Sequence, residues 1–163
     1  MIALKAEDVK SFTSKLFVKE DFDRFLVKEI NIVTYNSFTI DGHIRQGYYT
    51  EEELEEKKLE DFSTWKMMRP LSFSLIKGRR LPGSFHITLL LPPDEVNQFA
   101  SRSGSGMDPG RIEGLYLNIR YEDGALYCVT GTSLDFFTMD KTLETEWDNW
   151  VQGFMRSHDI ACI

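Results

Sequence analysis

The chain has 163 residues, of which 42% are hydrophobic and 13% aromatic, which is enough for one domain with a substantial core. Residues 1–8 become charged before any apolar stretch of signal-peptide length, and apolar runs such as Leu89–Leu91 are too short to span a bilayer. We therefore expect neither secretion nor membrane insertion. Cys128 and Cys162 form no CxxC pair, which indicates neither a disulfide framework nor zinc and favours a reducing cytoplasm.

The formal net charge of −7 is distributed unevenly. Seven acids and two lysines between Glu51 and Asp61 give that segment a net charge of −5. The segment from Lys66 to Pro93 contains no acid and five bases. These bases are Lys66, Arg69, Lys77, Arg79 and Arg80. The total charge argues against a general affinity for nucleic acid, but the basic segment keeps a local one possible.

The first elements read as a short strand at 1–4 and a helix at 7–17, where apolar residues recur at helical spacing. Alternation then predicts a strand at 29–34, a turn at 35–37 and a strand at 38–40. Asp41-Gly42 is typical of a type I′ hairpin turn and predicts an edge strand at 43–49. Three antiparallel strands are therefore expected after the first helix.

The acidic segment opens with Thr50-x-x-Glu53, a capping box that predicts a short solvated helix or a mobile excursion. Strands are predicted at 71–76 and 84–91, joined by a hairpin tip at 77–83 that carries most of the basic cluster. Pro92-Pro93 ends the second of these strands.

The last third of the chain begins with a helix predicted at 94–101 and a flexible loop at 103–106. Alternation predicts strands at 115–121, 125–130 and 134–139. Asp140 is a plausible N-cap for a C-terminal helix at 140–157. The apolar stripe of this helix consists of Leu143, Trp147, Trp150, Val151 and Phe154.

A shift of the chain by 87 positions reveals an internal repeat. It superimposes Leu4–Ser14 on Leu91–Ser101 and brings Ile30 and Ile32 onto Leu117 and Ile119. Common ancestry and chance likeness of two amphipathic units both explain the match. In either case we predict one α+β domain of two β-α-β-β-β units with pseudo-twofold symmetry. The antiparallel sheet would carry its helices on one side.

The predicted domain therefore has four parts. Unit one covers about 1–48, an acidic insertion about 50–62, unit two about 84–139 and the C-terminal helix about 140–157. This order resembles one domain of the DNA sliding clamps, which implies a clamp-like fold. Clamp helices present bases to the duplex, whereas residues 7–17 mix acids and bases, and a ring of this chain would have to be a homo-hexamer. The resemblance concerns architecture and carries no functional motif.

A second resemblance covers nearly the whole chain. Its segments are Phe38–Gly42, Tyr49–Glu53, Phe73–Gly78 and Leu117–Tyr121. They resemble a family of short bacterial proteins catalogued as a domain of unknown function. The resemblance implies a bacterial, cytoplasmic protein and names neither an activity nor a site.

The basic residues Arg69, Lys77, Arg79 and Arg80 are the first candidate binding site, because guanidinium groups at a projecting hairpin suit phosphate oxygens. The simpler alternatives are ion pairs with the acidic segment or protection of a sheet edge, and we favour these.

Trp147, Trp150 and Phe154 are the second candidate, as a partner groove or homodimer seam. Packing in the core of the chain is the simpler alternative for all three.

No catalytic signature, cofactor motif or metal site is predicted. His43, His86 and His158 are scattered without ligand spacing. The leading hypothesis is a non-enzymatic binding or assembly module that acts through a protein partner or self-association. The alternative is a small-ligand-binding or enzymatic domain whose site assembles only in three dimensions, from residues such as Arg69, His86 and Asp135.

Overall fold

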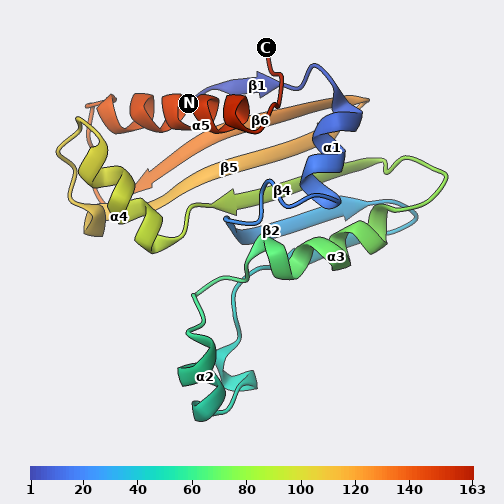
Figure 1. The fold of residues 1–163 in the computed structure, drawn as a ribbon, viewed down its shortest axis with the longest axis horizontal. Helices are drawn as coiled ribbons and strands as arrows, with labels where there is room; N and C mark the ends of the chain where they lie inside the picture. The colour runs from blue at the N-terminus through green and yellow to red at the C-terminus, as the bar shows by residue number, and fades with distance from the viewer.

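The computed structural model describes residues 1–163 and contains one six-stranded antiparallel sheet (Figure 1). The strand order is β1-β6-β5-β4-β2-β3. The strands are β1 (Ala3–Lys5), β2 (Leu26–Val33), β3 (Ser37–Asp41), β4 (Ser84–Leu90), β5 (Ile112–Glu122) and β6 (Ala125–Leu134). The helices are α1 (Val9–Phe17), α2 (Glu51–Lys57), α3 (Trp65–Ile76), α4 (Pro93–Arg102) and α5 (Thr142–Ser157). The predicted α+β class is confirmed.

Alternating side chains give the sheet one apolar and one polar face. The strand registers align one row of buried residues: Ile30, Ile87, Ile119, Cys128 and Leu4. The next row points to the opposite face and is polar: Asn31, His86, Arg120, Tyr127 and Lys5. Helices α1, α3, α4 and α5 contribute apolar residues to the same buried cluster as the first row, so they cover the apolar face (Figure 1).

Two fully buried tryptophans connect helices to the rest of the core. The indole N–H of Trp65, in α3, donates to the carbonyl of Leu16 in α1 at 2.8 Å. The indole N–H of Trp147, in α5, donates to the carbonyl of Tyr116 in β5 at 3.1 Å. Because each indole has a backbone partner, these large side chains are buried without an unpaired donor.

Residues 71–76, predicted as a strand, form the second half of α3. The helix begins after Thr64, whose hydroxyl accepts the backbone N–H of Met67 at 3.1 Å. Trp65 and Ser72 are buried two helical turns apart, which gives α3 one inward face. The strand prediction was wrong because the apparent alternation in its short window hides the helical period that starts at Trp65.

The predicted strands at 43–49 and 134–139 are also wrong. Gly42 is buried, and a Cβ there would lie 1.8 Å from the carbonyl oxygen of Val27. This glycine is therefore required for close backbone approach and does not form a type I′ turn. β6 instead continues to Leu134 in register with β5, after which the chain leaves the sheet. Each unit thus contains β-α-β-β and lacks the third predicted strand.

The last residues of the chain cover the outer edge of β1. Lys5 and Ile163 exchange two backbone hydrogen bonds, of 3.1 and 2.8 Å. The outward backbone groups of Lys5 in this edge strand are thereby satisfied. No helix combines the length and apolar character needed to cross a membrane.

Candidate functional site

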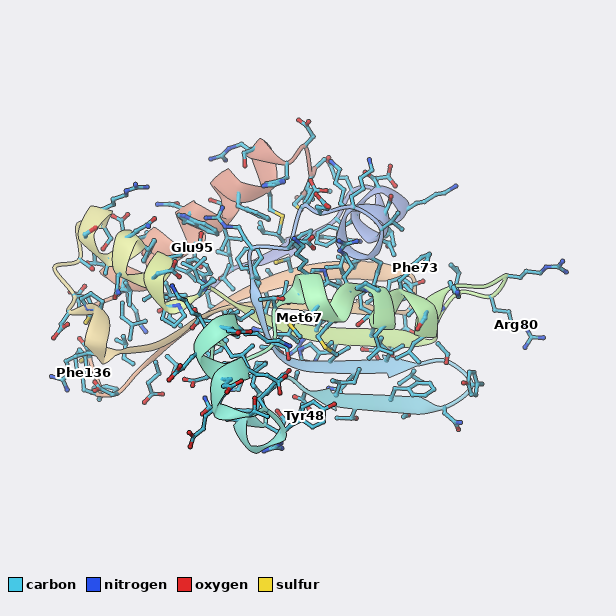
Figure 2. All side chains as sticks on the ribbon, turned by 60° about the horizontal axis from the view of Figure 1, so that its bottom comes forward. Tyr48, Met67, Phe73, Arg80, Glu95 and Phe136 are labelled. Carbon is cyan, nitrogen blue, oxygen red and sulfur yellow. The ribbon has the colours of Figure 1, made fainter.

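The basic loop, residues 77–83, connects α3 to β4. Lys77 ends the helix with an extended backbone, and Gly78 follows with a φ of +148°, which side chains rarely allow. Lys77, Arg79 and Arg80 are exposed, and Arg80 points away from the body of the protein (Figure 2). The predicted hairpin tip is therefore a helix-to-strand loop, because a helix precedes it.

Arg69 was grouped with this loop from the sequence but has a partner elsewhere. Its guanidinium donates to both carboxylate oxygens of Asp23, each at 2.9 Å, and to the carbonyl of Val18 at 3.2 Å. The Arg69 and Asp23 side chains are only 16% and 13% exposed. The hydrogen bonds to Asp23 raise the pKa of Arg69 above its usual value. Arg69 thus connects α3 to the segment that follows α1 and does not join the basic loop.

A cavity of about 800 Å³ lies between α1 and α3 and reaches the basic loop. We call it the α1–α3 groove. Its apolar lining includes Val9, Phe17, Val18, Phe73, Ile76 and Leu81. Val18, Phe73 and Leu81 are 55%, 37% and 83% exposed, so the groove is open to solvent. Exposed apolar side chains that line one groove are typical of binding surfaces.

The rim of the groove is positively charged. Lys10 lines the groove, and Lys77, Arg79 and Arg80 line an adjoining cavity of about 440 Å³ on the other side of the basic loop. No acidic residue lines either cavity. None of these four bases makes an ion pair within the chain. Their charge is therefore not neutralised by an ion pair, which favours an anionic partner.

The acidic segment lies on an arm, residues 43–62, that projects from the N-terminal end of α3 (Figure 1). We call it the acidic arm. A backbone hydrogen bond of 2.8 Å from Ile44 to Asp61 closes its neck. No residue of the arm is buried. The arm and the basic loop lie at opposite ends of α3 in both views (Figures 1 and 2), and no ion pair joins them, so the predicted pairing of these two segments is wrong.

The predicted capping box begins α2. The Thr50 hydroxyl accepts the N–H of Glu53, and the Glu53 carboxylate accepts the N–H of Thr50, both at 3.2 Å. The acids in the first turn also interact favourably with the helix dipole. Local interactions therefore account for this helix, which buries no residue against the body.

The three candidate interface residues of α5 differ in burial. Trp147 and Phe154 are 0% and 5% exposed and belong to the buried core cluster. Trp150 is partly buried and stacks against both, with ring centroids at 5.0 and 5.8 Å. Only Trp150 reaches a surface cleft, of about 300 Å³. Core packing accounts for the other two, and a partner surface at Trp150 stays a prediction.

The residues named for the enzymatic alternative lie apart. Asp135 pairs with Arg111 at 2.9 Å beyond the end of β6, while Arg69 lies on a helix over the apolar face. His86 belongs to the polar face of β4. No group of three or more His, Cys, Asp or Glu side chains could hold a metal ion. These residues form neither an acid–base pair nor a ligand set.

His86 is nevertheless an unusual side chain on the polar face. Its Nε2 atom is buried and has no hydrogen-bond partner. Burial lowers the pKa of His86, and the positive charge of Arg120 on the neighbouring strand lowers it further. Both effects favour the neutral ring.

The family comparison agrees with the resemblance seen in the sequence. The model described as Family of unknown function (DUF5721) matches residues 15–162. The chain belongs to this family. No curated protein and no solved structure matches it. The segment matched to DUF5721 includes the acidic arm, α3 and the basic loop.

Sequence reasoning missed the α1–α3 groove in this DUF5721 member. The groove requires residues 65–76 to be a helix parallel to the sheet surface, and half of that helix was taken for a strand. Thr64 directly before Trp65 was the available signal, because a threonine before an apolar period is a common helix start. The basic loop itself was identified, but its apolar neighbour was not.

Proposed function

We propose that the chain is a non-enzymatic binding module and that the α1–α3 groove, with the basic loop, receives its partner. The observation that carries this proposal is an open apolar groove beside four bases without ion pairs and without lining acids. The partner that fits best is an acidic amphipathic protein segment. Its apolar side chains would fill the groove while its carboxylates meet Lys77, Arg79 and Arg80.

The openness of the groove supports a protein segment over a small molecule. Small-ligand sites bury most of the ligand and surround it with a few converging polar groups. Here Leu81, which lines the groove, is 83% exposed, and the charged groups gather on the rim. A segment that lies along the groove would cover these side chains.

The test is a fluorescence anisotropy titration with a labelled helical peptide that has glutamates on one face and leucines on the other. We expect salt-sensitive binding that Leu81→Asp weakens about tenfold or more, which corresponds to about 1.4 kcal/mol. The triple variant Lys77→Glu/Arg79→Glu/Arg80→Glu should weaken it at least as much. Leu71→Asp is the matched control, because Leu71 is an exposed leucine of α3 that does not line the groove.

Three results would contradict the proposal. They are no binding, equal loss in the Leu71 and Leu81 variants, or binding that is indifferent to the triple variant. Duplex DNA serves as the competing polyanion, because the basic loop also suits phosphates. Binding of DNA in place of the peptide would favour the nucleic-acid hypothesis raised by the sequence.

The proposal extends to architecture and location. One buried cluster includes residues from Leu4 to Ile160, which supports a single domain. The order β-α-β-β occurs twice, which supports a clamp-like plan. The first strands of the two units differ in their neighbours, because β1 pairs with β6 alone and β4 pairs with both β2 and β5. Cys128 and Cys162 are free thiols, which is consistent with a bacterial cytoplasmic setting.

A further inference from the structure

We propose that the partner received by the α1–α3 groove is the acidic arm of a second copy of this chain. The two copies would exchange arms reciprocally and form a dimer. This inference rests on the proposed function, because it uses the same groove and the same basic loop. It adds the identity of the occupant.

The acidic arm has the charge and exposure that such an occupant needs. Its segment from Glu51 to Asp61 carries seven acids against two lysines, and none of these acids makes an ion pair within the chain. Tyr48 lies on the arm (Figure 2) and is 84% exposed. Leu54 of α2 is only partly buried. The arm thus offers both carboxylates and apolar side chains to a complementary surface.

In this structure the arm lies away from the groove of its own chain (Figure 1). Its neck joins the N-terminal end of α3, whereas the basic loop follows the C-terminal end (Figure 1). At a rise of about 1.5 Å per residue, the two ends of this helix lie about 18 Å apart. The neck hydrogen bond and the arm's projection away from the body hold it outward. With the arm in this position, the complementary charges can meet only between copies.

Reciprocal exchange of the arms would limit the assembly to a dimer. Each chain has one arm and one groove, so two chains related by a twofold axis satisfy both arms and both grooves. The attraction is between exposed charges, and salt screens it strongly. The expected mass is about twice 18.9 kDa at low salt and falls toward the monomer as salt increases.

The test is a charge-swap experiment on the full chain, read by light scattering at about 50 mM and about 500 mM salt. The loop variant carries Lys77→Glu/Arg79→Glu/Arg80→Glu, and the arm variant carries Glu51→Lys/Glu52→Lys/Glu55→Lys/Glu56→Lys. Each variant alone should be monomeric, because its arm and loop then bear the same sign. An equimolar mixture of the two should form a heterodimer, because both contacts are again complementary.

Arg120→Glu is the control, since Arg120 is an exposed base without an ion pair on the polar face of the sheet, and this variant should dimerise like the wild type. A wild-type monomer at low salt, a dimer that survives either swap, or a mixture that stays monomeric would overturn the inference. So would a mass that increases without limit as concentration rises.

The peptide titration separates this inference from the proposed function. A neutral arm variant, Glu51→Gln/Glu52→Gln/Glu55→Gln/Glu56→Gln, keeps an intact groove and does not itself attract the peptide, so it should bind the acidic peptide more tightly than the wild type. If the wild type is monomeric and both proteins bind the peptide equally, the arm is not the occupant but the groove remains a docking site. If neither protein binds the peptide, the proposed function itself fails.

Discussion

Replacing Arg69 should destabilise the fold and leave the binding surface intact. Arg69 is mostly buried and donates two hydrogen bonds of 2.9 Å to Asp23 and one of 3.2 Å to Val18. Hydrogen bonds to charged groups typically contribute about 1.5–3 kcal/mol each, and breaking a fully buried ion pair costs about 3–5 kcal/mol. Because this pair retains some exposure, we expect Arg69→Ala to lower the free energy of unfolding by about 2 kcal/mol.

Urea denaturation followed by circular dichroism measures this loss. For a chain of this size, about 2 kcal/mol corresponds to a decrease in Tm of about 4–8 °C. A double-mutant cycle with Asp23→Ala should give a coupling energy of about 1–2 kcal/mol. Lys66→Ala is the control, because Lys66 is an exposed base of the same helix without an ion pair, and it should change stability by less than about 0.5 kcal/mol. A loss below about 0.5 kcal/mol for Arg69→Ala, together with lost peptide binding, would refute the structural role.

Three further changes test other parts of the structure. Because the pKa of His86 is lowered by burial and by Arg120, the folded state binds fewer protons than the unfolded state just below the usual pKa of 6.5. Stability should therefore fall as the pH decreases through that value, and urea titrations of His86→Gln should show a smaller fall. Phe154→Ala should lower the free energy of unfolding by about 3–5 kcal/mol without changing the solution mass. A changed solution mass with little loss of stability would restore the interface hypothesis. Thr50→Ala should remove about 1 kcal/mol of local stability from α2, seen as faster amide exchange in residues 51–57, while urea unfolding of the whole chain is unchanged.

The elements with a clear period were predictable from the sequence. Alternation over most of β4 and β5 and helical spacing in α1, α4 and α5 each reflect burial of one face against the same core. The capping box at Thr50 was also predicted, because both of its hydrogen bonds lie within four residues of the chain. Asp140, expected to cap the last helix, does not: Lys141 is the N-cap of α5, and the Asp140 carboxylate accepts the backbone N–H of Thr142 at 3.0 Å from one residue before the cap.

The errors share a physical cause, which is that tertiary contacts decided the local structure. Gly42 looks like a turn glycine, but its missing side chain allows contact with the backbone of β2, and this contact is distant in sequence. The groove depends on α1, α3, the basic loop and two strands at once. The charged rim of the groove could be predicted because bases without nearby acids form a local pattern in the sequence. Its apolar lining could not, because those residues come from separate parts of the chain.

The measurement that tests the central claim most directly is an amide chemical-shift map of the 15N-labelled full chain as the acidic amphipathic peptide is added. We predict that the largest shifts fall in residues 9–18 and 73–82, which line the groove and its rim. They should be absent from the Lys77→Glu/Arg79→Glu/Arg80→Glu variant. Shifts that cluster instead on the polar face around His86 and Arg120 would contradict the account and identify that face as the binding surface.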